Sequence, residues 1–441
     1  MFSRKDLIKL MVPLIIEQIL AVAVGMLDVL MVAAAGEAAV SGVASVDAIG
    51  QLLIFILTAL ATGGAVVISQ YLGRNDHKNA GIAANQLIIV TLIAGLFFMM
   101  LSVLGNHLIL RIILGDIGRE VMDNARIYFY ITALSFPFLA VYNGCTAIYR
   151  SMGNSKVSMI VSVIMNAMNI AGNAAFVYGF QMGAAGVGLS TLISRIAAAI
   201  IMIVIVRNEK NVVHIDKKLK LGYQPRMIQN ILRIGIPNGL ENGMFQFGKV
   251  IIQRLIASLG TVAIAANAIG ANVAGIQILP GVAIGVGLIT VVGQCVGAGE
   301  YEQAKKYTRQ LVLAAYILIG IFGLGTIVLS GALVGLYGLS GEVSVMAVKI
   351  IIWHSVTAIL FWPLSFTLPN VLRAAGDARF TMAVSVTSMW LCRIVLAYIF
   401  VRVFNTDVFG VWMAMTVDWV FRLLLFAWRF ISGKWIKQKS S

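Results

Sequence analysis

The stretch that decides the fold is residues 7–32, "LIKLMVPLIIEQILAVAVGMLDVLMV". It is long and apolar enough to cross a bilayer as a helix, because about 20 residues span the hydrocarbon core. It nevertheless contains two carboxylates, Glu17 and Asp28. In a helix these side chains project from nearly the same face, about 16 Å apart along the axis. Because a charge in hydrocarbon is costly, such residues face protein or water, and a function is expected for them.

The rest of the chain is equally apolar. Of its 441 residues, 60% are hydrophobic and only 12% are charged, whereas about a quarter of a soluble protein is charged. The chain is therefore predicted to be an integral membrane protein with many spans. Its net charge of +15 comes mostly from short loops between apolar runs. That pattern is typical of the positive-inside rule and does not indicate a nucleic-acid partner.

Twelve apolar runs are long enough to span the membrane, and they lack the alternation of barrel strands, so an all-α protein is predicted. The predicted spans are 10–33, 48–71, 85–105, 125–149, 157–180, 187–206, 235–258, 268–294, 310–330, 345–371, 380–401 and 409–430. Every second loop is basic, including 207–226. Both termini are therefore expected on the cytoplasmic side of the cell membrane.

The chain also repeats itself. The matched pairs are Pro13 with Pro237, Glu17 with Glu241 and "SQYLG" (69–73) with "GQCVG" (293–297) at an offset of 224, and "YRSMGNSK" (149–156) with "LRAAGDAR" (372–379) at 223. Several matches at one offset predict a duplicated six-helix unit, and an even number of spans gives both copies the same orientation. The predicted domains are an amino-terminal lobe (1–206), a basic cytoplasmic linker (207–226) and a carboxy-terminal lobe (227–441).

With these features the chain resembles the multidrug and toxic compound extrusion (MATE) family over essentially its whole length. The resemblance is carried by Pro13, Gly25, Asp28, Gly36, "ISQYLGRND", "VVGQCVGAGEYEQAKK", the two paired motifs above and "NIAGNAAFVYGFQMGAAGVGLST" (169–191). It implies two six-helix lobes arranged in a V around a central cavity. It also implies efflux of organic, usually cationic, compounds in exchange for protons or sodium ions.

The resemblance implies a coupling site in the amino-terminal lobe. It consists of Asp28 with Asn169, Asn173 and Thr191. The two asparagines are one helical turn apart on one face. A buried carboxyl can load and release a proton, and the same oxygens can bind sodium as a hard cation. These four residues are metal ligands only if the transporter is sodium-coupled, and no cofactor is expected.

Further charged residues lie within the predicted spans. Glu17 and Glu241 either line the central cavity as a negative floor for substrate or hold helices together. Asp418 on span twelve lies near Arg422 and Arg393, which indicates either a buried ion triad or a second protonation site.

Three other residues bear on the substrate. Lys249 and Arg195 are intramembrane cations that either pair with acids or receive an anionic substrate. Trp362 stands on span ten, where some family members have an acid, and either forms part of an aromatic wall of the substrate cavity or packs in the core.

The expected partners are a small organic substrate, the coupling cation and the bilayer, with a monomer implied by the resemblance. The sequence has no Walker A motif and no nucleophile elbow, and its histidines are scattered, so an enzyme is not expected. A flippase for lipid-linked precursors or polysaccharides and an organic-anion exporter remain alternatives of the same fold. A membrane-embedded enzyme would need an acid, histidine or metal cluster, and a scaffold would not need intramembrane carboxylates.

Overall fold

The computed structural model of the protein describes residues 1–441 except 34, 116–117, 216–223, 340 and 437–441. The predicted linker 207–226 and the end of the predicted lobe 227–441 therefore lie partly outside the described residues. Within the described residues every regular element is helical, which confirms the predicted all-α fold.

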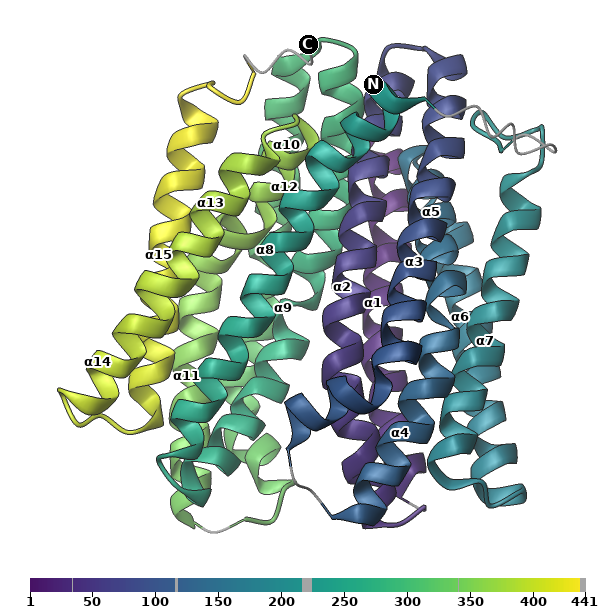
Figure 1. The fold of residues 1–441 in the computed structure, drawn as a ribbon. Coiled ribbons are helices and arrows are strands. Elements are labelled where there is room, and N and C mark those ends of the chain that lie inside the picture. Colours follow the sequence, from purple (N-terminus) through teal and green to yellow (C-terminus); the bar gives the residue numbers. More distant parts are fainter. Residues whose placement is uncertain (34, 116–117, 216–223, 340, 437–441) are drawn as a thin grey trace. The chain divides into compact units, whose positions relative to one another are not determined.

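The first half of the chain forms long helices joined by short turns (Figure 1). Their bounds are α1 (Arg4–Ala33), α2 (Glu37–Gly73), α3 (His77–Leu114), α4 (Arg119–Leu134), α5 (Phe136–Ser151), α6 (Ser155–Asn173), the π-helical turn η1 (Ala174–Gly179) and α7 (Gly183–Val206). Helices α4 and α5 meet at a bend of 45°.

The second half follows the same plan with more interruptions. Its elements are α8 (Pro225–Ala257), α9 (Thr261–Gly297), α10 (Tyr301–Gly335), α11 (Gly341–Trp362), η2 (Pro363–Thr367), α12 (Pro369–Ala374), α13 (Ala378–Ser388), η3 (Met389–Val395), α14 (Leu396–Arg402) and α15 (Val408–Ile431). Proline accounts for the break between α11 and α12, because its ring removes a helical hydrogen bond.

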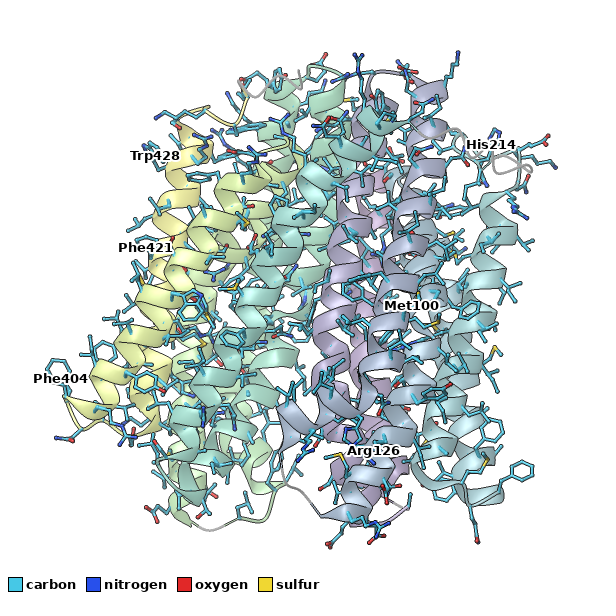
Figure 2. All side chains as sticks on the ribbon, viewed as in Figure 1. Met100, Arg126, His214, Phe404, Phe421 and Trp428 are labelled. Carbon is cyan, nitrogen blue, oxygen red and sulfur yellow. The ribbon has the colours of Figure 1, made fainter. Side chains whose placement is uncertain are left out.

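Ten helices of the described residues are long and apolar enough to cross a membrane, or up to 11 if the bent pair α4 and α5 forms one span. The remaining predicted span, 235–258, corresponds to α8, whose apolar character is interrupted by Glu241, Gln246 and Lys249. Large apolar side chains lie on the outside of the helices, as Met100 and Phe404 show (Figure 2). A soluble protein rarely exposes so much apolar surface, so these faces are suited to lipid.

Packing divides the chain into two compact units. The amino-terminal unit is Phe2–Gly239, and the carboxy-terminal unit is Leu240–Ser441 together with Met1. The first half of α8 therefore packs with the amino-terminal unit. The predicted lobe limits, which follow the sequence repeat rather than packing, stay a prediction.

The duplication is visible in the backbone of the turns. Gly36 has φ 96° and Gly260 has φ 94°, while Gly153 has φ 78° and Gly376 has φ 91°. Each pair is separated by the repeat offset found in the sequence. Side chains with a Cβ rarely adopt such positive φ values, so glycine is kept where both copies make the same turn.

A close approach of two helices in the amino-terminal unit gives a stability test. A methyl group on Gly63 of α2 would lie 2.5 Å from the Ile231 carbonyl oxygen and 2.8 Å from the Gly235 amide nitrogen of α8. Gly63→Ala is therefore expected to destabilise the protein by about 1–3 kcal/mol, because backbone must move to admit the methyl group. Gly320→Ala, where the space is open, is the matched control. Thermal unfolding in detergent measures both, and equal midpoints would refute the close approach.

Candidate functional site

A cavity of about 260 Å³ lies within the amino-terminal unit. Helices α1, α2, α4, α5, α6 and α7 contribute to its wall. Its polar and charged lining residues are Asp28, Asp47, Gln51, Tyr128, Thr132, Asn166, Asn169, Thr191, Ser194 and Arg195. Two carboxylates against one guanidinium give this cavity a formal charge of −1.

Asp28 is held by a neutral amide. Asn173 Nδ2 donates a hydrogen bond of 2.8 Å to Asp28 Oδ1, and Asn173 is fully buried. The other amide atom, Asn173 Oδ1, has no hydrogen-bond partner among the described residues. Buried polar atoms are rarely left without a partner. This oxygen is therefore suited to accept a hydrogen bond or to coordinate a cation.

The second asparagine joins α6 to α7. Asn169 Nδ2 donates to Ser190 Oγ at 3.4 Å and to Thr191 Oγ1 at 3.3 Å. Ser190 Oγ in turn donates to the Asn169 carbonyl oxygen at 2.6 Å. Helix α7 comes this close because Gly172 lies opposite Ser190, where a Cβ would collide with the serine side chain.

The structure brings the four predicted coupling residues into one chain of contacts. Asn173 Nδ2 lies 3.5 Å from Asn169 Oδ1, so Asp28, Asn173, Asn169 and Thr191 are connected in that order. Their oxygens come from one carboxylate, two amides and a hydroxyl. Such a set suits a hard monovalent cation, and the carboxylate alone can bind a proton.

Asp47 lines the cavity although the sequence did not predict it as a site residue. Tyr128 Oη donates a hydrogen bond of 2.8 Å to Asp47 Oδ1, and both residues line the cavity. The predicted second span begins at residue 48, whereas α2 begins at Glu37. The signal that could have found Asp47 is Gly36, a helix breaker that places the start of α2 well before this aspartate.

Arg195 is the counter-charge of the cavity. It lines the wall, and its Nη1 donates a hydrogen bond of 2.7 Å to Ser135 Oγ at the bend between α4 and α5. The intramembrane cation predicted on span six therefore lies beside the two carboxylates rather than in lipid.

Glu17 and Glu241 form equivalent ion pairs in the two halves. Arg150 Nη2 lies 2.7 Å from Glu17 Oε1, and Arg373 Nη2 lies 2.6 Å from Glu241 Oε1. Both glutamates are 7% exposed. The arginines belong to the paired motifs "YRSMGNSK" and "LRAAGDAR", so the duplication preserved the pair. The cavity-lining role of these glutamates stays a prediction.

The amino-terminal pair can be tested by removing one or both charges. Arg150→Met leaves the Glu17 carboxylate buried without its cation, which is expected to cost about 3 kcal/mol. The double variant Glu17→Gln/Arg150→Met removes both charges and is expected to recover most of that loss. Thermal unfolding of the parent, the single and the double variant measures the effect. A double variant no more stable than the single one would contradict the pairing.

Asp418 is the centre of a triad in the carboxy-terminal unit. Its Oδ1 lies 3.0 Å from Arg422 Nε and its Oδ2 lies 3.7 Å from Arg393 Nη1. Ser388 Oγ also donates to Asp418. Asp418 is fully buried, so the structure shows the ion triad, while a role in protonation stays a prediction.

Lys249 and Trp362 occupy different surroundings. Lys249 is exposed, and its Nζ lies 5.1 Å from the centroid of the Phe245 ring. Trp362 is 4% exposed and stacks on Phe366 with 5.2 Å between ring centroids. The position of Trp362 is that of a core residue, and its predicted contact with substrate stays a prediction.

Comparison with known proteins gives a match over most of the chain. The family model described as MatE matches residues 13–175 and again residues 237–399. Equivalent positions of the two matches differ by 224 residues, which is the offset of the sequence repeat. An uncharacterised transporter, YisQ of Bacillus subtilis, is 30% identical over 97% of this chain and 94% of its own length. A probable multidrug resistance protein, NorM of Thermotoga maritima, is 27% identical over 99% of this chain and 94% of its own.

Solved structures show the same fold. An outward-facing multidrug resistance MATE family transporter superimposes with a TM-score of 0.92 at 18% identity, over 99% of this chain and 97% of the other. A MATE protein in a bent conformation superimposes with a TM-score of 0.91 at 17% identity, over 99% and 96% of the two chains.

Proposed function

The chain belongs to the MatE family of transporters, as its sequence motifs predicted, and from this premise we propose that it is a secondary antiporter for organic cations. Family membership makes it a membrane transporter rather than an enzyme, and its relatives include multidrug resistance proteins. The proposal adds that an inward flow of protons or sodium ions drives export. It also places both termini in the cytoplasm and takes the monomer as the working unit.

The observation that carries the proposal is the difference between Asp28 and three other intramembrane carboxylates. Glu17, Glu241 and Asp418 each form an ion pair with an arginine. Asp28 instead accepts a hydrogen bond from the amide of Asn173. An amide can donate to the ionised carboxylate and accept from the protonated one, so Asp28 can change its state without breaking an ion pair.

The same site allows sodium as the coupling ion. Asp47 adds a second carboxylate to the cavity. Asn173 Oδ1, which has no hydrogen-bond partner among the residues that the structure describes, adds a neutral ligand. Both ions would therefore be attracted to one place. We keep protons and sodium as alternatives that the flux experiment separates.

The test is dye flux in proteoliposomes that contain ethidium, with either a proton gradient or a sodium gradient imposed. The parent is expected to move ethidium with one of the two gradients, and this identifies the coupling ion. In Asp28→Asn the gradient-driven ethidium flux is expected to fall at least about tenfold, because the amide side chain cannot bind a proton or supply a formal charge.

The control is Asp407→Asn, which makes the same substitution at a helix cap. Asp407 accepts a hydrogen bond from the Phe409 amide at 2.8 Å, and asparagine caps a helix equally well. Its flux is expected to match the parent. Full gradient-driven flux in Asp28→Asn would remove Asp28 from the coupling mechanism, and no ethidium flux with either gradient would overturn the proposed function.

Asp47 gives a second test of the same cavity. Asp47→Asn keeps an oxygen for the Tyr128 hydroxyl but removes one negative charge near the coupling site. The concentration of the coupling cation that gives half-maximal flux is expected to rise on the order of tenfold, because a nearby opposite charge favours cation binding. Tyr128→Phe removes the hydroxyl without changing the charge and is expected to shift this value less. An unchanged value in Asp47→Asn would show that Asp47 does not act on the coupling ion.

A further inference from the structure

The carboxy-terminal unit contains a basic cluster around one aromatic ring. The centroid of the Phe245 ring lies 5.1 Å from Lys249 Nζ, 5.4 Å from Arg393 Cζ and 5.5 Å from Arg422 Cζ. The three cations come from α8, η3 and α15, of which α8 lies far from the other two in the sequence. We call these four residues the basic cluster.

The three cations of the basic cluster outnumber the negative charges around them. Asp418 pairs with both arginines, and in the described part of the chain Lys249 forms no ion pair. The other buried acids of this unit are engaged elsewhere, since Glu241 pairs with Arg373 and Asp377 pairs with Arg429. Three cations therefore face one carboxylate, which leaves a formal excess of two positive charges.

An excess of this kind needs a compensating group. Like charges repel more strongly away from bulk water, and ionisable residues within spanning helices usually mark a functional site. The Phe245 ring attracts cations through its face, but one ring serves all three. An anion is the group that the charges of this cluster lack.

The arrangement separates fixed cations from accessible ones. Arg422 is 3% exposed, and its Nη2 also donates to the Ser385 carbonyl oxygen at 3.1 Å, so it is held in place. Lys249 is exposed, and the Arg393 side chain is 14% exposed. Arg393 also lies within a π-helical turn, a distortion that often accompanies functional sites. Lys249 and Arg393 are therefore the groups that a ligand can reach.

The repeat shows that this charge pattern arose locally. The position equivalent to Lys249 in the first half is Gly25, and the position equivalent to Asp28 in the second half is Ile252. The Glu–Arg ion pairs, by contrast, are the same in both halves. The two halves thus share the Glu–Arg ion pairs. In the equivalent part of their first helices, however, one half has the acid Asp28 and the other has the cation Lys249.

We propose that the basic cluster binds the acidic group of an aromatic organic anion, such as an aromatic carboxylate or sulfonate. Lys249 and Arg393 would contact the anionic group, and Arg422 would act as a positioning residue through Asp418. Aromatic rings border the cluster: Phe366 lies 5.0 Å from Arg422 Cζ, and Trp362 stacks on Phe366 with 5.2 Å between ring centroids. The inference rests on the proposed export function, whose substrate range it extends from cations to aromatic anions.

The test is equilibrium binding to the purified full-length protein in neutral detergent. Fluorescein, an aromatic carboxylate, is followed by fluorescence anisotropy, and ethidium is measured in parallel. Lys249→Gln is expected to weaken fluorescein binding by about tenfold or more, as the loss of a charge-assisted contact implies. Ethidium binding is expected to stay within about twofold of the parent. Lys249→Arg, which keeps the charge, is expected to retain fluorescein binding.

Lys349→Gln is the matched control. Lys349 Nζ lies 4.1 Å from the ring centroid of Phe409, so it is also a lysine over a phenylalanine in the same unit, outside the basic cluster. Its fluorescein affinity is expected to equal that of the parent. Benzenesulfonate is expected to compete for the site, and inorganic sulfate at the same concentration is not. If Lys249→Gln does not fold, Phe245→Leu serves in its place, with the same weakening of fluorescein expected because it removes the central ring.

The outcomes separate this inference from the proposed function. Fluorescein binding that depends on Lys249 supports the inference even if ethidium flux is absent, in which case only the proposed function fails. Normal ethidium flux without fluorescein binding in the parent overturns the inference alone. Equal weakening in Lys249→Gln and Lys349→Gln also overturns it, since general charge attraction would then explain binding. Equal competition by sulfate would overturn the requirement for an aromatic ligand.

Discussion

The hydrogen bond from Asn173 to Asp28 is the contact on which the functional account depends. A carboxylate within a membrane needs a partner, because desolvating it alone costs several kcal/mol. Glu17, Glu241 and Asp418 meet this need with arginine. Asp28 meets it with a neutral amide in a cavity that it shares with Asp47 and Arg195, so a cation can bind its carboxylate without displacing a directly paired arginine. The same physical constraint is thus met by ion pairs at Glu17, Glu241 and Asp418. At Asp28 it is met by a hydrogen bond that leaves the carboxylate available to a cation.

Duplication explains which charges recur and which do not. The Glu–Arg pairs sit beside turns whose glycines have positive φ in both halves, such as Gly153 and Gly376. Replacing one member of such a pair would leave the other as an unpaired buried charge. The glutamate and the arginine are therefore both kept in each half. The site residues are free of this constraint, and the two units now differ there. One has an acidic cavity around Asp28, and the other has cations around Phe245.

The sequence was sufficient for the fold because its signals are strong ones. Long apolar runs, alternating basic loops and a repeat at one offset predicted an all-helical membrane protein, and the family comparison matched that repeat twice. Within the site, Asn169 and Asn173 could be placed together because one helical turn separates them. Their contact with Asp28 followed from the family resemblance and not from the sequence pattern.

Other features needed coordinates. The sequence did not predict Asp47 as a site residue, because hydropathy places a helix end where polarity rises. In the structure α2 begins ten residues before Asp47. The partners of Glu17 and Glu241 lie about 130 residues away along the chain, and spacing alone cannot identify such contacts. The cluster around Phe245 likewise joins three helices that are distant in sequence, so its excess charge becomes visible only when the helices are packed.

The central claim is that a cation at Asp28 and the exported substrate exclude one another, as antiport requires. The most direct measurement is the equilibrium dissociation constant of ethidium for the purified protein over a range of pH, with and without sodium. Binding linkage predicts that this constant rises with the concentration of the coupling cation in the parent and is insensitive to it in Asp28→Asn. An ethidium affinity in the parent that depends on neither pH nor sodium would contradict the account.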